Sequence, residues 1–183
     1  TEEECDELKK EHPDFAYIED AGRGFRRVVP SPKPIKMLEV GVVLVMLEKG
    51  MIPIASGGGG VPVVSDGKGG YVGVEGVIDK DFGAAQMAKD VDADELIILT
   101  AVDNVCVNFN KPDQKALANV TVEELEKYMA EGQFAAGSML PKVQAAIKFV
   151  TAKPGCRAVI TSPDKVADLV AGVPGVGTII RSM

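Results

Sequence analysis

The sequence has 183 residues, enough for one domain with a substantial core, and its 46% hydrophobic and 26% charged residues are ordinary for a globular protein. A formal net charge of −7 argues against nonspecific nucleic-acid binding. The three cysteines are far apart and form no CxxC pair, so neither a zinc site nor a disulfide framework has support. The most apolar run is too short to span a bilayer. We therefore expect a cytoplasmic protein without nucleic-acid or membrane partners.

The first 34 residues are polar and charged, and they are predicted to form a separate small part of the chain. Thr1 and Glu4 have the spacing of a capping box for a short helix that ends before Pro13. Residues 20–34, DAGRGFRRVVPSPKP, are rich in Gly, Arg and Pro and predict a loop or a small hairpin. The main α/β domain is predicted to comprise residues 35–183.

From residue 35 onward, helix and strand patterns alternate. Predicted helices cover 38–49, 81–93, 121–131, 141–152 and 164–171, and predicted strands cover 51–56, 71–74, 96–99, 157–161 and 178–181. This alternation predicts a layered α/β fold with a mainly parallel sheet. The continuous apolar run 96–99 is expected in the middle of that sheet.

Four consecutive glycines lie in the stretch ASGGGGVPVV, residues 55–64, directly after the predicted strand 51–56. Glycine lets a ligand approach the main chain closely, and ligands of parallel sheets bind at the carboxyl ends of strands. Thr100 and Asp103 follow the strand 96–99, and Thr161 and Ser162 follow the strand residues 157–160. These positions favour a binding loop over a flexible linker at 57–60.

The common phosphate-binding motifs do not fit these glycines. In a P-loop, Gly69 would occupy the Ser or Thr position, and in a dinucleotide motif Pro62 would stand where a helix should begin. The glycines alone are therefore a weak indication of phosphate binding.

Two lysines lie in the first turns of predicted helices, Lys80 in VIDKD (77–81) and Lys142 in GSMLPK (137–142). A helix N-terminus already carries positive potential, so a lysine there is better tolerated when an anion is bound. A phosphate site is plausible on this ground. Taken alone, VIDKD is more simply explained by helix capping through Asp79 or Asp81.

Six stretches occur in one order that closely resembles the carbamate kinases, a family of the amino-acid kinase superfamily. They are SPKP (31–34), ASGGGGVPVV (55–64), VIDKDF (77–82), LTAVDNV (99–105), NFNKPDQK (108–115) and GSMLPK (137–142). The resemblance extends over essentially the whole chain. DAGRGFRRVV at 20–29 resembles the end of the family's small protruding subdomain, so residues 1–34 would be a remnant of it with its connecting loop.

The resemblance implies a three-layer αβα sandwich, a homodimer, and reversible phosphoryl transfer between carbamoyl phosphate and ADP that gives ATP and carbamate, with Mg²⁺. Lys80 and Lys142 would contact the transferred phosphoryl group, and Asp81 would hold both lysines. The nucleotide would contact Thr100, Asp103, Ser138 and Met139, and the carbamoyl side would face Gly57, Gly58 and Gly59. No residue of the chain is assigned as a metal ligand.

The sequence departs from the family pattern in several places. The family's first strand and its Gly-Gly-Asn turn have no counterpart, which implies that the N-terminal strands of the fold are absent from these residues. Gln133 stands where the family often has His, Gly83 where it has Ala, and Cys106 where it has an aromatic residue. Two alternatives remain open: a non-catalytic or incomplete fragment that only binds nucleotide or dimerises, or another superfamily member such as an acetylglutamate or uridylate kinase.

Overall fold

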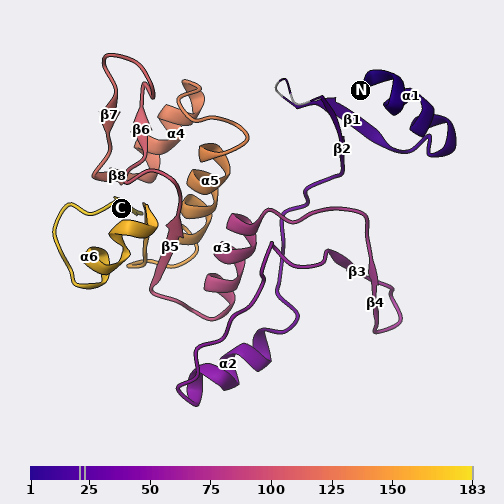
Figure 1. The fold of residues 1–183 in the computed structure, drawn as a ribbon. Helices are drawn as coiled ribbons and strands as arrows, with labels where there is room; N and C mark the ends of the chain where they lie inside the picture. Colours follow the sequence, from indigo (N-terminus) through magenta and orange to yellow (C-terminus); the bar gives the residue numbers. More distant parts are fainter. Residues whose placement is uncertain (21, 23, 183) are drawn as a thin grey trace. The chain divides into compact units, whose positions relative to one another are not determined.

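The computed structural model describes residues 1–182 except 21 and 23 (Figure 1). The chain divides into two compact units, one of residues 1–32 with 61–78 and the other of residues 33–60 with 79–183. The sequence patterns did not indicate that residues 61–78 would join the N-terminal residues. The domain division at residue 34 stays a prediction.

The first unit consists of one helix and two antiparallel hairpins. Helix α1 (Glu2–Glu11) begins with the predicted capping box between Thr1 and Glu4. The first hairpin pairs β1 (Ala16–Glu19) with β2 (Phe25–Val28), and the second pairs β3 (Val63–Ser65) with β4 (Tyr71–Gly73). The predicted helix before Pro13 and the strand at 71–74 are confirmed.

The second unit is organised around a four-stranded sheet with the order β5-β9-β10-β8. The strands are β5 (Glu95–Leu99), β8 (Asn119–Thr121), β9 (Arg157–Thr161) and β10 (Thr178–Arg181). β5 is parallel to β9 and β8 is parallel to β10, whereas β9 and β10 are antiparallel. The sheet is therefore mainly parallel, as predicted, with one antiparallel pairing.

The placement of β5 corrects one expectation. The run 96–99 was expected in the middle of the sheet, but β5 lies at its edge and pairs only with β9 among the described strands. An apolar run predicts that side chains of the strand are buried, as Leu96 and Ile98 are here. It does not report how many neighbouring strands accept the backbone hydrogen bonds.

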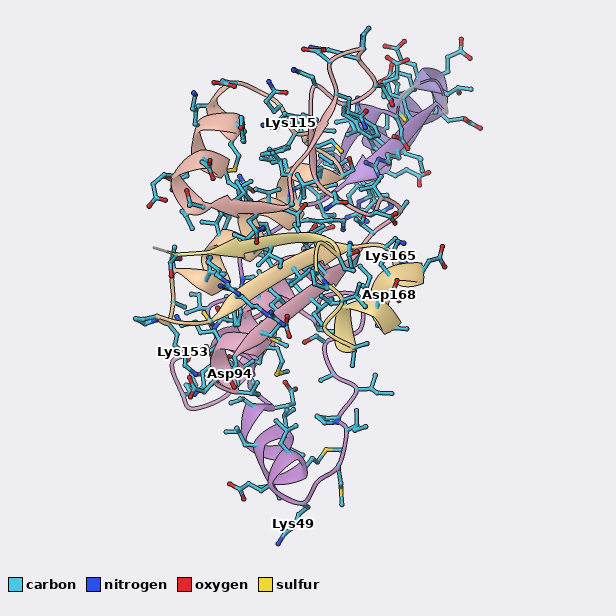
Figure 2. All side chains as sticks on the ribbon, turned by 90° about the vertical axis from the view of Figure 1, so that its left-hand side faces the viewer. Lys49, Asp94, Lys115, Lys153, Lys165 and Asp168 are labelled. Atoms are coloured by element: carbon cyan, nitrogen blue, oxygen red, sulfur yellow. The ribbon has the colours of Figure 1, made fainter. Side chains whose placement is uncertain are left out.

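Helices lie on both sides of this sheet, which gives the layered arrangement that was predicted. α3 (Lys80–Asp90) and α5 (Met139–Val150) pack against each other and against the strands, and α4 (Val122–Ala130) packs against β8. The short helix α6 (Val166–Val170) lies on the other side of the strands in Figure 1, and Figure 2 shows Asp168 of this helix toward the viewer. α5 is central to the core because Val143, Ala145 and Ala146 are fully buried.

Residues 51–56 do not form the predicted strand. Helix α2 (Val40–Glu48) ends as expected before Gly50, but the following segment is irregular, and Ile52 and Ile54 are 91% and 99% exposed. A strand needs a neighbour for its backbone hydrogen bonds, and no described segment pairs with this one. The apolar run thus predicted a conformation that it does not adopt here. Within the described residues, no helix is both long and apolar enough to cross a membrane.

Candidate functional site

The glycine run forms a tight turn whose backbone requires glycine. Gly59 N–H donates to the carbonyl of Ser56 over 2.7 Å, and Gly59 and Gly60 have φ angles of 125° and 88°. Side chains disfavour these angles because of clashes with Cβ. The sequence therefore places glycine at 59 and 60 for a conformational reason, although the turn does not follow a strand as expected.

The glycine turn packs directly on the first part of α3. A Cβ added to Gly83 would lie 3.2 Å from both Cα and the carbonyl oxygen of Gly59, closer than ordinary van der Waals contact. Because Gly83 is in α3, this contact brings the turn beside the helix that carries Lys80 and Asp81. The glycines and the lysine-aspartate motif, predicted separately, thus belong to one region.

Asp79 and Asp81 have different tasks at the start of α3. The Asp79 carboxylate accepts the backbone N–H groups of Asp81 and Phe82 over 2.8 Å and 3.4 Å, so Asp79 is the N-cap. This arrangement leaves the Asp81 carboxylate available for other partners. Capping was the simpler interpretation of VIDKD, and it holds for Asp79 and not for Asp81.

Asp81 joins two lysines from the first turns of two helices. Its Oδ2 accepts from Lys142 Nζ over 2.8 Å and from Lys80 Nζ over 3.2 Å, although Lys142 is 61 residues away in the chain. Asp81 and Lys142 are buried, with 6% and 8% of their surface exposed. The Lys80 side chain is 59% exposed, so its ammonium group can still contact solvent or a ligand.

The electrostatics of this cluster favour an anion. Burial alone would lower the pKa of Lys80, but the hydrogen bond and charge of Asp81 outweigh it, and the pKa of Lys80 is raised above its usual value. Two ammonium groups around the Asp81 carboxylate leave one excess positive charge, which the nearby Asp79 carboxylate partly offsets. The first turns of α3 and α5 add positive potential from their helix dipoles. The arrangement can neutralise and orient a phosphoryl group without covalent chemistry.

A cavity of about 510 Å³ lies where loops meet at the ends of β5 and α4 and at the start of α5. This volume is within the range of about 300–1,000 Å³ typical of small-molecule sites. Thr100, Ser138 and Met139, three of the four residues predicted to contact a nucleotide, line it. Its walls also include Cys106 and Gln133, two of the departures noted in the sequence.

Asp103, the fourth predicted nucleotide contact, is outside this lining. Its carboxylate accepts from the Ser162 hydroxyl over 2.5 Å, and its carbonyl accepts from Thr161 Oγ1 over 3.1 Å. The backbone N–H of Thr100 donates to the carbonyl of Thr161 over 2.8 Å. The ends of β5 and β9 therefore meet as predicted, and this geometry supports a turn-stabilising position for Asp103.

Several residues of the site were not singled out from the sequence. Within the described part of the chain, Ser56 Oγ is the one buried side-chain polar atom without a hydrogen-bond partner, and it directly precedes the glycine turn. Asn108, Phe109 and Lys111 line the cavity. They lie in NFNKPDQK, a stretch quoted only for its resemblance. Ser138 is the N-cap of α5 but makes no capping bond through its side chain.

The fold and the site define the class of protein. The Amino acid kinase family matches residues 9–162, and the chain belongs to this family. It is 56% identical over 180 residues to a carbamate kinase of Oenococcus oeni, and the matched region covers 97% of this chain and 56% of that protein. A carbamate kinase of Lentilactobacillus hilgardii is also 56% identical, over 98% of this chain and 55% of that protein.

Solved structures give the same relationship. The carbamate kinase of Giardia lamblia bound to AMP-PNP superposes with a TM-score of 0.88 at 40% identity, over 100% of this chain and 57% of that chain. The fold is therefore that of the amino-acid kinases, as predicted. The chain spans about half the length of the relatives that it matches.

Proposed function

We propose that this chain acts in a carbamate kinase, which transfers a phosphoryl group reversibly between carbamoyl phosphate and ADP to give ATP and carbamate. One observation carries the proposal: the buried Asp81 carboxylate holds Lys80 and Lys142 together at the first turns of two helices. The identity of 56% to the carbamate kinase of Oenococcus oeni supports the choice of this reaction within the family.

The proposed chemistry relies on positioning and charge. In the direction of ATP formation, the bond between phosphorus and the carbamate oxygen breaks while a bond to the terminal phosphate oxygen of ADP forms. The negative charge on the oxygens of the phosphoryl group needs neutralisation more than a covalent partner. Lys80 and Lys142 would supply that charge, and Asp81 would keep both ammonium groups in place.

The glycine turn would bind the carbamoyl side of the substrate. Gly57, Gly58 and Gly59 offer a backbone without side chains, which a small planar group can approach closely. The unpartnered hydroxyl of Ser56 at the start of this turn supports the assignment, because a buried hydroxyl without a partner costs free energy that a ligand can recover.

The nucleotide would occupy the cavity beside Thr100, Ser138 and Met139. The AMP-PNP complex of the Giardia lamblia relative supports nucleotide binding by this fold. Within the described residues, no group of three His, Cys, Asp or Glu side chains could hold a metal ion. Mg²⁺ would bind with the nucleotide, mainly through the phosphates of ADP or ATP, as it commonly does. Asp103 as a nucleotide contact, the homodimer and the cytoplasmic location stay predictions.

The test is ATP formation by the full-length protein from carbamoyl phosphate and ADP, measured in a coupled assay. We expect turnover in the ordinary range of kinases, about 1–100 per second. If the protein binds ADP but forms no ATP, the non-catalytic alternative is favoured. ATP-dependent phosphorylation of acetylglutamate or uridylate, with none of carbamate, would favour another member of the superfamily.

A further inference from the structure

One wall of the nucleotide cavity is the tip of a small hairpin. Strands β6 (Cys106–Val107) and β7 (Lys115–Ala116) pair antiparallel, and residues 108–114 connect them. The tip contributes Phe109 and Lys111 to the cavity, and the Phe109 side chain is 52% exposed. An exposed aromatic ring and an ammonium group on one wall offer contacts to a nucleobase and to phosphates, respectively.

Most hydrogen bonds of this tip remain inside the hairpin. Asn108 Nδ2 donates to the Asp113 carboxylate over 2.8 Å, and the Asn110 N–H donates to Gln114 Oε1 over 2.8 Å. Among the hydrogen bonds of the described residues, one joins residues 108–114 to a residue outside the hairpin. The Asn108 N–H donates to Gln133 Oε1 over 2.9 Å. The tip is thus joined to the residues that follow α4 through one side-chain carbonyl.

Gln133 is itself held firmly by the end of α4. Gly132, with a φ angle of 70°, donates its N–H to Met129, and the Gln133 N–H donates to Tyr128 over 3.0 Å. This pair of bonds is a Schellman motif, which fixes the residues that follow a helix. The next residue, Phe134, is buried in the core. The backbone at Gln133 is therefore fixed by the end of α4, whereas its partner Asn108 belongs to a loop.

We propose that Gln133 is a positioning residue for the nucleotide: by accepting the Asn108 N–H, it holds Phe109 and Lys111 where they contact ADP or ATP. The inference rests on the proposed function, because it requires that the nucleotide occupies this cavity. It assigns Gln133 an effect on nucleotide affinity and none on the phosphoryl-transfer step.

The first test replaces Gln133 by methionine, which keeps the length of the side chain and removes the acceptor. Loss of a hydrogen bond to a partly buried N–H predicts a KM for ADP raised about five- to tenfold with kcat nearly unchanged. Gln114→Met is the matched control, because it removes an acceptor that bonds within the hairpin. We expect this control to raise the KM for ADP less than Gln133→Met does, because the bond that joins the hairpin to Gln133 remains.

The second test separates positioning from direct contact with the nucleotide. A neutral imidazole can accept the Asn108 N–H, and an imidazolium cannot. For Gln133→His, the ratio of its KM for ADP to that of the wild type should therefore rise as the pH falls through the usual histidine value of about 6.5. The ratio of the two KM values cancels pH effects that arise from the nucleotide or from neighbouring ionisable groups, because both proteins contain them. These groups are Cys106, Lys111, Asp113 and Glu131.

The outcomes are distinct. A raised KM for Gln133→Met, together with a rising ratio for Gln133→His at low pH, supports the proposal. A Gln133→Met variant with the affinity of the wild type overturns it and leaves the proposed function intact. A ratio that falls at low pH also overturns it, because it would mean that position 133 donates to the nucleotide. Failure of the wild type to bind ADP in calorimetry would instead overturn the proposed function.

Discussion

The lysine-aspartate cluster and the cavity differ in how their geometry is held. The cluster lies on the first turns of α3 and α5, and its central residues Asp81 and Lys142 are buried. The cavity is lined mainly by loops, and its hairpin wall is joined to the residues after α4 through Gln133. Under the proposed function, the helices fix the charged groups for the chemical step, and the loops bind the nucleotide. Changes to the lysines and Asp81 of the cluster should affect kcat, and changes in the cavity should affect the KM for ADP.

The largest effect is expected for Lys142→Ala in the full-length protein. Removal of one preorganised donor to a developing charge should lower kcat by roughly 10²- to 10³-fold. Steady-state kinetics should show a KM for ADP that stays close to that of the wild type. Lys142→Arg should restore activity only in part, since a planar guanidinium differs from a compact ammonium group. Near-normal turnover of Lys142→Ala would contradict a phosphate contact.

The glycine turn allows a second test of the cluster region. Gly59→Ala places a Cβ at a φ of 125°, which should cost about 1–3 kcal/mol in strain or displace the turn. We expect a lower melting temperature and a raised KM for carbamoyl phosphate. Gly58→Ala is a suitable control for stability, because a Cβ there meets no atom within 4 Å. Equal melting temperatures for the two variants would show that the turn does not need glycine at 59.

Phe109→Ala tests the cavity side of the comparison. The exposed ring on the hairpin wall is expected to contact the base, and stacking of a base on an aromatic ring contributes about 1–3 kcal/mol. The KM for ADP should rise about tenfold, which corresponds to about 1.4 kcal/mol, while kcat changes little. A large fall in kcat with an unchanged KM would break the proposed separation between the two regions.

The smallest effect is expected at the surface. Lys153 forms ion pairs with Asp92 and Asp94, and Figure 2 shows Lys153 and Asp94 close together beside the sheet. Exposed pairs of this kind contribute little to stability. Lys153→Ala should leave kcat, KM and the melting temperature within experimental error of the wild type. A clear change in kcat would mean that charge far from the cluster influences the reaction.

Much of the fold could be predicted from local signals. The capping box at Thr1 predicted α1 and the helical pattern at 121–131 predicted α4, and both helices form as expected. The strand 51–56 and the central position of 96–99 could not be predicted correctly, because both depend on which segments lie alongside. Sequence periodicity describes a segment, and pairing is a property of the whole sheet.

The candidate site shows a similar limit. The lysines at helix starts and the glycine run were visible in the sequence, but the sharing of one carboxylate by Lys80 and Lys142 depends on the packing of α3 against α5. The contact between Gln133 and Asn108 joins residues 25 apart, and no local pattern indicates it. The unpartnered Ser56 hydroxyl could be identified only once its surroundings were known.

The central claim is that the Asp81 carboxylate holds two ammonium groups for phosphoryl transfer. The most direct test is kcat together with the melting temperature for Asp81→Asn in the full-length protein. Asp79 already caps α3, so the fold should persist. Asparagine has no charge to hold two ammonium groups, and a unit-charge contact near 4 Å corresponds to about 4 kcal/mol at an effective dielectric of about 20 before desolvation. We predict a kcat lowered by about two orders of magnitude in a protein that still folds, with a lowered melting temperature because the buried Lys142 ammonium loses its counter-charge. Unchanged kcat at an unchanged melting temperature would contradict the account.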